Sequence, residues 1–282
     1  MNIGIFYQSG FKFVACYMAV EQFRKHYPDA PIALFEDNSD ILKPIADKFS
    51  CDYKKTDICG TNGKSWGRPI VDLNSNLAFL KRINEACNTT LKNVDYFIIY
   101  EDDVWCLRKI QKQPKFDLSG ANGPIYSQKL SEYLFDRFNT NQKERGHWSS
   151  KGSLESYQAC GGTIINRLKF IEAYKKINEI NWQMIKELDS RPLEWSDASL
   201  SFVMQHAGFS CGRWEDWGPY EHKNKTSMDK SGWLTPFSEG LGDFAFLHYY
   251  KHYYSYNEEE LELARAKVLC EERGFTLNYQ QS

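Results

Sequence analysis

Three consecutive acidic residues follow an apolar run: Glu101, Asp102 and Asp103 come directly after Tyr96–Tyr100. Adjacent carboxylates repel one another unless a positive group or water offsets their charge. At the end of a buried strand they would make a hard-oxygen site for Mg²⁺ or Mn²⁺, and such an ion stabilises charge on a diphosphate leaving group. The alternative is a solvated loop with excess negative charge. We favour the metal site, because the preceding strand is apolar at every position.

The first half of the chain alternates short apolar runs with segments of helical spacing. The expected strands are 3–7, 31–35, 51–53 and 96–100, and the expected helices are 11–27, 41–49 and 72–87. This alternation predicts an α/β fold with an open, mainly parallel, twisted sheet flanked by helices. Ligands of such sheets bind beyond the carboxyl ends of the strands. The pair Glu36-Asp37 and the acidic triplet both follow such ends.

The second half is less regular. Its expected helices are 128–138, 168–177, 196–207 and 258–273, its last strand is 244–247, and 109–124 reads as a loop with room for one short strand. The sequence has no internal repeat, low-complexity segment or clear linker, so we expect a single domain over residues 1–282.

Composition narrows the class of partner. The 35 basic and 37 acidic residues give a net charge of −2, and no long basic run appears, which disfavours nucleic acid. Aromatic residues make up 15% of the chain, and Tyr and Trp suit sugars and bases as well as the core.

The cysteines bear on whether the chain has a zinc site, and the N-terminal sequence bears on its cellular location. The eight cysteines form no CxxC pair, so a zinc site is poorly supported and reduced, buried thiols are expected. Neither a signal peptide nor a long apolar run is present, which predicts a soluble, cytoplasmic chain with peripheral membrane association still open.

The segment Tyr96-Phe-Ile-Ile-Tyr-Glu-Asp-Asp-Val104 resembles the strand and D-x-D motif of nucleotide-sugar-dependent glycosyltransferases with the GT-A fold. The resemblance implies transfer of a sugar from a nucleotide-diphosphate sugar to a carbohydrate or glycoconjugate hydroxyl, with Mn²⁺ or Mg²⁺ as cofactor. It also implies that Asp103 binds the metal, that Glu101 contacts the ribose or the metal shell, and that Asp102 supports the site or is an alternative ligand. Glu at the first position departs from the family pattern.

Further segments resemble the same family in the same order. The strand ending at Tyr7 resembles the opening strand whose loop faces the nucleotide, and Asp37 matches an acid that meets the base. Cys160-Gly161-Gly162-Thr163 resembles the glycine pair beneath the acceptor sugar. The alternatives are an ordinary polar strand end at Asp37 and a tight strand turn at the glycine pair.

The loop 54–69 carries two cations that could meet phosphate, Arg68 and Lys64, although solvated loop charges are the alternative reading. Trp217 is the acceptor-platform candidate that we carry forward, with Trp214 and Trp233 as competitors.

The segment Glu194-Trp-Ser-Asp197 resembles the family's Glu-Asp motif, in which the acid at a helix start acts as the base of an inverting transfer. By this resemblance Asp197 is the catalytic base, and a helix N-cap is the alternative. His248, after the last strand, resembles the histidine that completes the metal shell, with His252 as the competitor.

The resemblance divides the domain into a nucleotide-sugar-binding half (1–107), an acceptor-binding half (108–257) and a C-terminal helix (258–282). Two other functions compete with a hexosyltransferase. A sugar nucleotidyltransferase would open with a glycine-rich basic signature, which Gln8-Ser-Gly-Phe-Lys12 matches poorly. A non-catalytic carbohydrate-binding protein of the same fold is the other, and donor hydrolysis with Mn²⁺ would separate the three.

Overall fold

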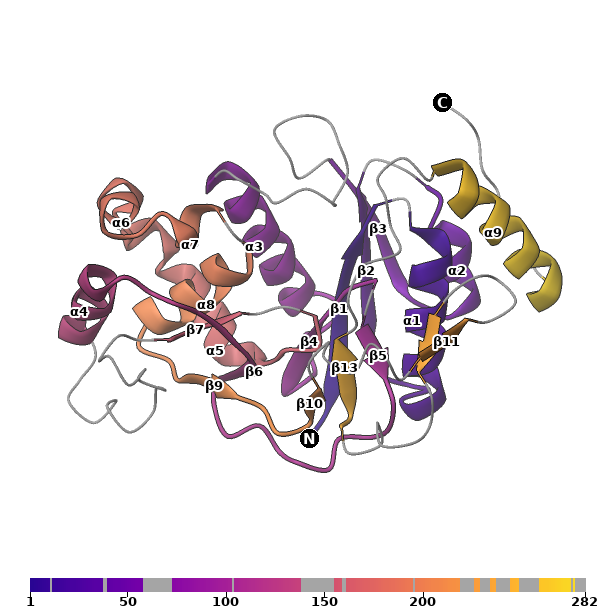
Figure 1. The fold of residues 1–282 in the computed structure, drawn as a ribbon, viewed down its shortest axis with the longest axis horizontal. Coiled ribbons are helices and arrows are strands. Elements are labelled where there is room, and N and C mark those ends of the chain that lie inside the picture. Colours follow the sequence, from indigo (N-terminus) through magenta and orange to yellow (C-terminus); the bar gives the residue numbers. More distant parts are fainter. Residues whose placement is uncertain are drawn as a thin grey trace.

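The computed structural model describes residues 1–10, 12–37, 40–57, 73–102, 104–137, 155–158, 161–194, 196–218, 226–228, 234–236, 244–248, 259–274 and 276. A central sheet runs through this part of the chain, with helices on both of its faces (Figure 1). It is the open α/β fold that the alternation of apolar runs predicts.

The central sheet has the strand order β3-β2-β1-β4-β8-β6-β7, and β9 pairs with β6. Its strands are β1 (Ile3–Ser9), β2 (Ile32–Asp37), β3 (Asp52–Thr56), β4 (Tyr96–Tyr100), β6 (Leu118–Ile125), β7 (Glu155–Gln158), β8 (Ile164–Asn166) and β9 (Cys211–Arg213). The four strands β3, β2, β1 and β4 are parallel, whereas β8 runs antiparallel to β4. The carboxyl ends of β1, β2 and β4 therefore meet at one edge of the sheet.

Short strands outside this sheet form two smaller pairings. A three-stranded sheet has the order β10-β13-β5, with β5 (Val104–Cys106), β10 (Trp217–Gly218) and β13 (Phe246–His248). The hairpin β11 (Thr226–Met228) and β12 (Leu234–Pro236) is antiparallel.

The helices follow most of the predicted spans. They are α1 (Phe13–His26), α2 (Lys43–Lys48), α3 (Leu73–Asn88), α4 (Gln128–Arg137), α5 (Arg167–Lys175), a 3-10 turn η2 (Ile177–Glu179), α6 (Trp182–Leu188), α7 (Arg191–Glu194), α8 (Ser196–His206) and α9 (Glu259–Arg273). The two short helices α6 and α7, and the full length of β6, were not predicted. None of the described helices is long and apolar enough to span a membrane.

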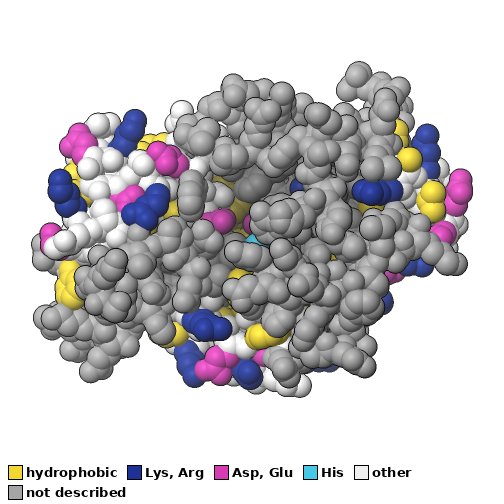
Figure 2. Space-filling view, viewed as in Figure 1, with side chains coloured by type: hydrophobic (Ala, Val, Ile, Leu, Met, Phe, Trp, Pro, Cys, Tyr) yellow, Lys and Arg dark blue, Asp and Glu magenta, His cyan; other side chains and the backbone are white. Residues whose placement is uncertain are grey.

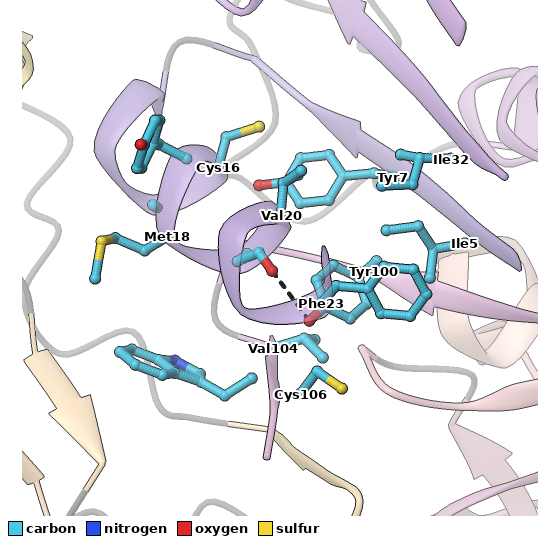
Figure 3. Close-up of a cluster of buried hydrophobic side chains, with 14 of the residues drawn as sticks. Ile5, Tyr7, Cys16, Met18, Val20, Phe23, Ile32, Tyr100, Val104 and Cys106 are labelled. Atoms are coloured by element: carbon cyan, nitrogen blue, oxygen red, sulfur yellow. Dashed lines mark hydrogen bonds between the residues drawn. The ribbon is translucent and has the colours of Figure 1, made fainter. Parts of the chain in front are cut away.

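Two hydrophobic clusters hold the layers together, one on each face of the sheet. Successive side chains of a strand point to opposite faces, so Ile5 and Tyr7 join the cluster under α1, while Phe6 joins the cluster under α3. Figure 3 shows part of the first cluster, where the Tyr100 hydroxyl donates to the carbonyl of Ala19 at 3.3 Å. The strand ends that carry the acidic residues are thus fixed by core on both faces.

A buried carboxylate anchors the small sheet. Asp216 accepts hydrogen bonds from Arg108 at 2.6 Å and from the backbone N–H groups of Gln111 and Lys112 at 2.7 Å each. Burial alone would raise the pKa of Asp216, but these donors lower it below the usual value. The next residue is Trp217, so this anchor fixes the strand that reaches the site described below.

Candidate active site

The acidic turn lies at the carboxyl end of β4, next to the histidine that the sequence predicts. The N–H of Val104 donates to the carbonyl of Glu101 at 3.1 Å, which closes the turn between β4 and β5. The antiparallel register of β5 and β13 then places His248 opposite Val104. The His248 Nε2 atom lies 3.7 Å from a carboxylate oxygen of Glu101. Figure 2 shows acidic side chains beside a histidine near the middle of one face.

The glycine pair lies against the same turn. Gly162 donates its N–H to the carbonyl of Ile99 at 2.7 Å, and Ile99 donates to Thr163 at 2.9 Å, so the pair runs alongside the end of β4. A Cβ atom at Gly161 would collide with Val104 and come within 3.2 Å of Glu101 Cβ. Glycine is therefore required for this close approach. The predicted neighbours at 101, 161–162 and 248 do meet in space.

Trp217 packs on this glycine pair. Its indole N–H donates to the carbonyl of Gly161 at 2.9 Å, and a Cβ atom at Gly162 would lie 2.9 Å from the ring. Gly162 has a φ of +88°, a conformation that favours glycine. With 8% of its surface exposed, Trp217 clamps the backbone of the site and offers little face as an acceptor platform. Trp214 is core, because it is buried and its N–H donates to Lys112.

The donor set at this turn fits a divalent ion. Metal–ligand bonds of about 2.1 Å place two ligand atoms of one ion roughly 3–4.2 Å apart, and the Glu101–His248 distance of 3.7 Å lies in that range. Carboxylate oxygen suits Mn²⁺ and Mg²⁺, and imidazole is a common metal ligand. Within the described ranges no group of three such side chains is arranged to hold a metal. The third predicted ligand, Asp103, lies outside those ranges.

Asp102 points to the other side of the turn. One of its oxygens accepts from the hydroxyls of Tyr7 at 2.5 Å and Ser9 at 2.8 Å, and the other lies 3.3 Å from the ammonium group of Lys12. The Asp102 side chain is 11% exposed. Its contacts cross-link the turn to β1 and to the start of α1, which is consistent with the supporting role among the two that the sequence leaves open, and a cofactor contact of Asp102 stays a prediction.

Tyr7 belongs to this cross-link. It is fully buried, which leaves no surface for the nucleotide contact that the sequence predicts. Burial, and then the neighbouring carboxylate of Asp102, raise the pKa of the Tyr7 hydroxyl well above its usual value. The hydroxyl therefore stays protonated and acts as a donor to Asp102.

Asp37, at the end of β2, is engaged inside the protein. One carboxylate oxygen accepts from Arg82 at 2.7 Å, from Gln8 at 3.1 Å and from Thr56 at 3.2 Å, and the residue is 3% exposed. Burial raises the pKa of Asp37, although Arg82 opposes the shift. The base contact that the sequence predicts would have to reach its second oxygen, which is buried and has no hydrogen-bond partner among the described residues.

Glu36 faces the opposite side of β2 and is structural. One of its carboxylate oxygens accepts from the Tyr53 hydroxyl at 2.6 Å and from the N–H of Leu42 at 3.1 Å. The residue is fully buried. These bonds fix the start of α2 against β3.

Asp197 lies in the first turn of α8 and is half-buried. The hydroxyl of Ser196 donates to its carboxylate at 3.5 Å, and no described contact joins it to Glu101. Its role as base therefore stays a prediction. Other predicted residues lie outside the described residues: Arg68, Lys64, Trp233 and His252.

Sequence reasoning missed two buried cations, Lys12 and Arg82. They pair with Asp102 and Asp37 and so determine that these two carboxylates are bonded within the protein. Lys12 is 5% exposed and precedes α1, and Arg82 is 9% exposed in the middle of α3. Arg82 had a partial signal, because Ala78, Phe79 and Ala86 at three- and four-residue spacing are apolar, and a basic residue buried among them needs a counter-ion. Lys12 precedes its helix and had no such signal.

No protein-family model matches the chain, and no curated protein matches it. A search of solved structures finds a galactosyltransferase, LgtC, in complex with donor and acceptor sugar analogues, at 11% sequence identity and a TM-score of 0.49. The match covers 99% of this chain and 98% of the other.

Proposed function

We propose that this chain transfers a sugar from a nucleotide-diphosphate sugar to an acceptor hydroxyl in a reaction that depends on a divalent metal ion. The supporting observation is the convergence of Glu101, the pair Gly161-Gly162 and His248 at the carboxyl end of β4. This is the edge of an open α/β sheet where ligands bind.

The residues divide the chemistry between them. Glu101 and His248, with Asp103, would hold Mn²⁺ or Mg²⁺, which would offset the charge on the departing diphosphate. The bare backbone at Gly161 and Gly162 lets Val104 and Trp217 pack closely beside Glu101 and so fixes the turn that carries it. In an inverting transfer Asp197 would take the proton of the acceptor hydroxyl, and the positive end of α8 favours its ionised form.

The test is release of nucleoside diphosphate from a panel of UDP-, GDP-, ADP- and dTDP-sugars, with and without Mn²⁺. A thermal-shift screen chooses the donor first, since a ligand of the native state raises the melting temperature. We expect metal-dependent release from one donor, and loss of that release in Glu101→Gln, which keeps the size of the side chain. Release that is equal in both proteins, or the same without metal, would contradict the proposal.

A further inference from the structure

The two described acids of the turn have opposite surroundings. Glu101 faces His248, whereas Asp102 faces β1 and the start of α1. A carboxylate buried beside other acids is costly unless a positive charge offsets it. Lys12 supplies that charge at 3.3 Å, and it is itself 5% exposed.

We propose that Lys12 is the charge-compensating residue of the acidic turn: its ammonium group offsets the charge of the Asp102 carboxylate, which Tyr7 and Ser9 hold on the β1 side, and so sets how strongly the turn binds a divalent cation. The inference rests on the proposed metal site at Glu101 and His248. It adds to that site a cation that is built into the fold.

The reason is electrostatic. With Lys12 in place, Asp102 adds little net charge beside the metal site, because the two charges form a pair shielded from water. The hydroxyls of Tyr7 and Ser9 bind one oxygen of Asp102, at 2.5 and 2.8 Å, so the carboxylate has donors even without the lysine. Loss of Lys12 would therefore leave Asp102 in place as an uncompensated negative charge near the ion.

Opposite shifts in metal affinity follow. Lys12→Met should tighten Mn²⁺ binding by about threefold to thirtyfold, the range for one unit charge near a divalent ion at an intermediate effective dielectric constant. Asp102→Asn should weaken binding by a similar factor, since the lysine then repels the ion without a counter-charge. The double variant restores the net charge, so its dissociation constant should lie within about twofold of the parent's.

The measurement is calorimetric titration of the metal-free protein with Mn²⁺. Lys12→Gln, which keeps a hydrogen-bond donor, replaces Lys12→Met if the latter does not fold. Lys43→Met is the control for charge alone: Lys43 pairs with Asp47 on an exposed face, where salt screens its charge, so the affinity should not change.

The outcomes separate the two claims. If the parent binds no Mn²⁺, the proposed metal site fails. If the parent binds Mn²⁺ but both single variants bind it more weakly, Lys12 is a structural residue and the inference is overturned, while the proposed function stands. Equal affinity in the parent and in both single variants would overturn the inference as well.

Discussion

The acidic residues that end β2 are buried and bonded within the protein, whereas at the end of β4 the side chain of Glu101 is 21% exposed and lies beside His248. We call these the closed and the open strand end. At the end of β2, Glu36 is bonded to Tyr53 and Asp37 to Arg82. At the end of β4, Asp102 is paired internally but Glu101 faces His248 across 3.7 Å. Both ends look alike in sequence, so the neighbours that supply donors decide which acid can meet a ligand.

The largest predicted effect is on the transfer rate, and it tests whether Asp197 acts as the base of the proposed reaction. Asp197→Asn keeps the size of the side chain and much of its ability to bond at the helix start, but it removes the basic oxygen. Transfer at saturating donor should fall by about 10²–10⁴-fold, the usual span for a general base, while nucleotide binding is unchanged. Asp47→Asn, at an exposed acid of α2, is the matched control. A rate in Asp197→Asn within a few-fold of the parent means that another group is the base or that the reaction retains configuration.

The second prediction concerns the closed end of β2. Arg82→Met should lower the free energy of unfolding by about 3–5 kcal/mol, because it leaves the buried carboxylate of Asp37 without its cation. In the variant the pKa of Asp37, already raised by burial, should rise further. Between the pKa that Asp37 has in the unfolded chain and its higher pKa in the folded variant, the native state binds more protons than the unfolded state. The stability of the variant therefore falls as pH rises through that window.

Urea unfolding of parent and variant at pH 5 and pH 7.5 checks this sign. The difference in free energy of unfolding between parent and variant should be smaller at pH 5 than at pH 7.5. The Mn²⁺ affinity of the folded variant should equal that of the parent. A deficit that does not depend on pH would mean that Arg82 contributes by packing rather than by its charge.

These two ends also show how far sequence reasoning extends. The buried strand β4 and the acids after it could be predicted from a local apolar run, and the glycine pair and His248 could be predicted from a resemblance to motifs that occur in the same order. The partners Lys12, Arg82 and Tyr53 could not be, since they come from the residue before α1, from α3 and from β3 and meet the acids only in the folded chain.

Trp214 and Trp217 make the same point. In sequence they are equivalent candidates for a sugar platform. In the structure Trp214 donates its N–H to Lys112 and lies in the core, whereas Trp217 donates to Gly161 beside the site. A residue type indicates what a side chain can do, and the long-range register of β10, β13 and β5 decides where it does it.

The third prediction tests the open end. His248→Ala should weaken Mn²⁺ binding by about 10–100-fold, the range for losing a group that supports a metal site, or by more if the imidazole is a direct ligand. Activity should then recover in part at high Mn²⁺. Titration of turnover against Mn²⁺ measures this, and an identical metal dependence in variant and parent would remove His248 from the site. Loss of folding would instead place it in the core.

The smallest predicted effect comes from removing one hydroxyl group at the closed end of β2. Tyr53→Phe removes the 2.6 Å bond to Glu36, while the N–H of Leu42 still donates to the same carboxylate oxygen. The free energy of unfolding should therefore fall by about 1–2 kcal/mol, near the value for one hydrogen bond to a charged group. Because this bond lies at the closed end of β2, the Mn²⁺ affinity and the transfer rate should match the parent's. Denaturant unfolding and Mn²⁺ titration of the same preparation measure both quantities. A variant of unchanged stability but altered metal affinity would show that the two strand ends are coupled, and the division between a closed and an open end would then be wrong.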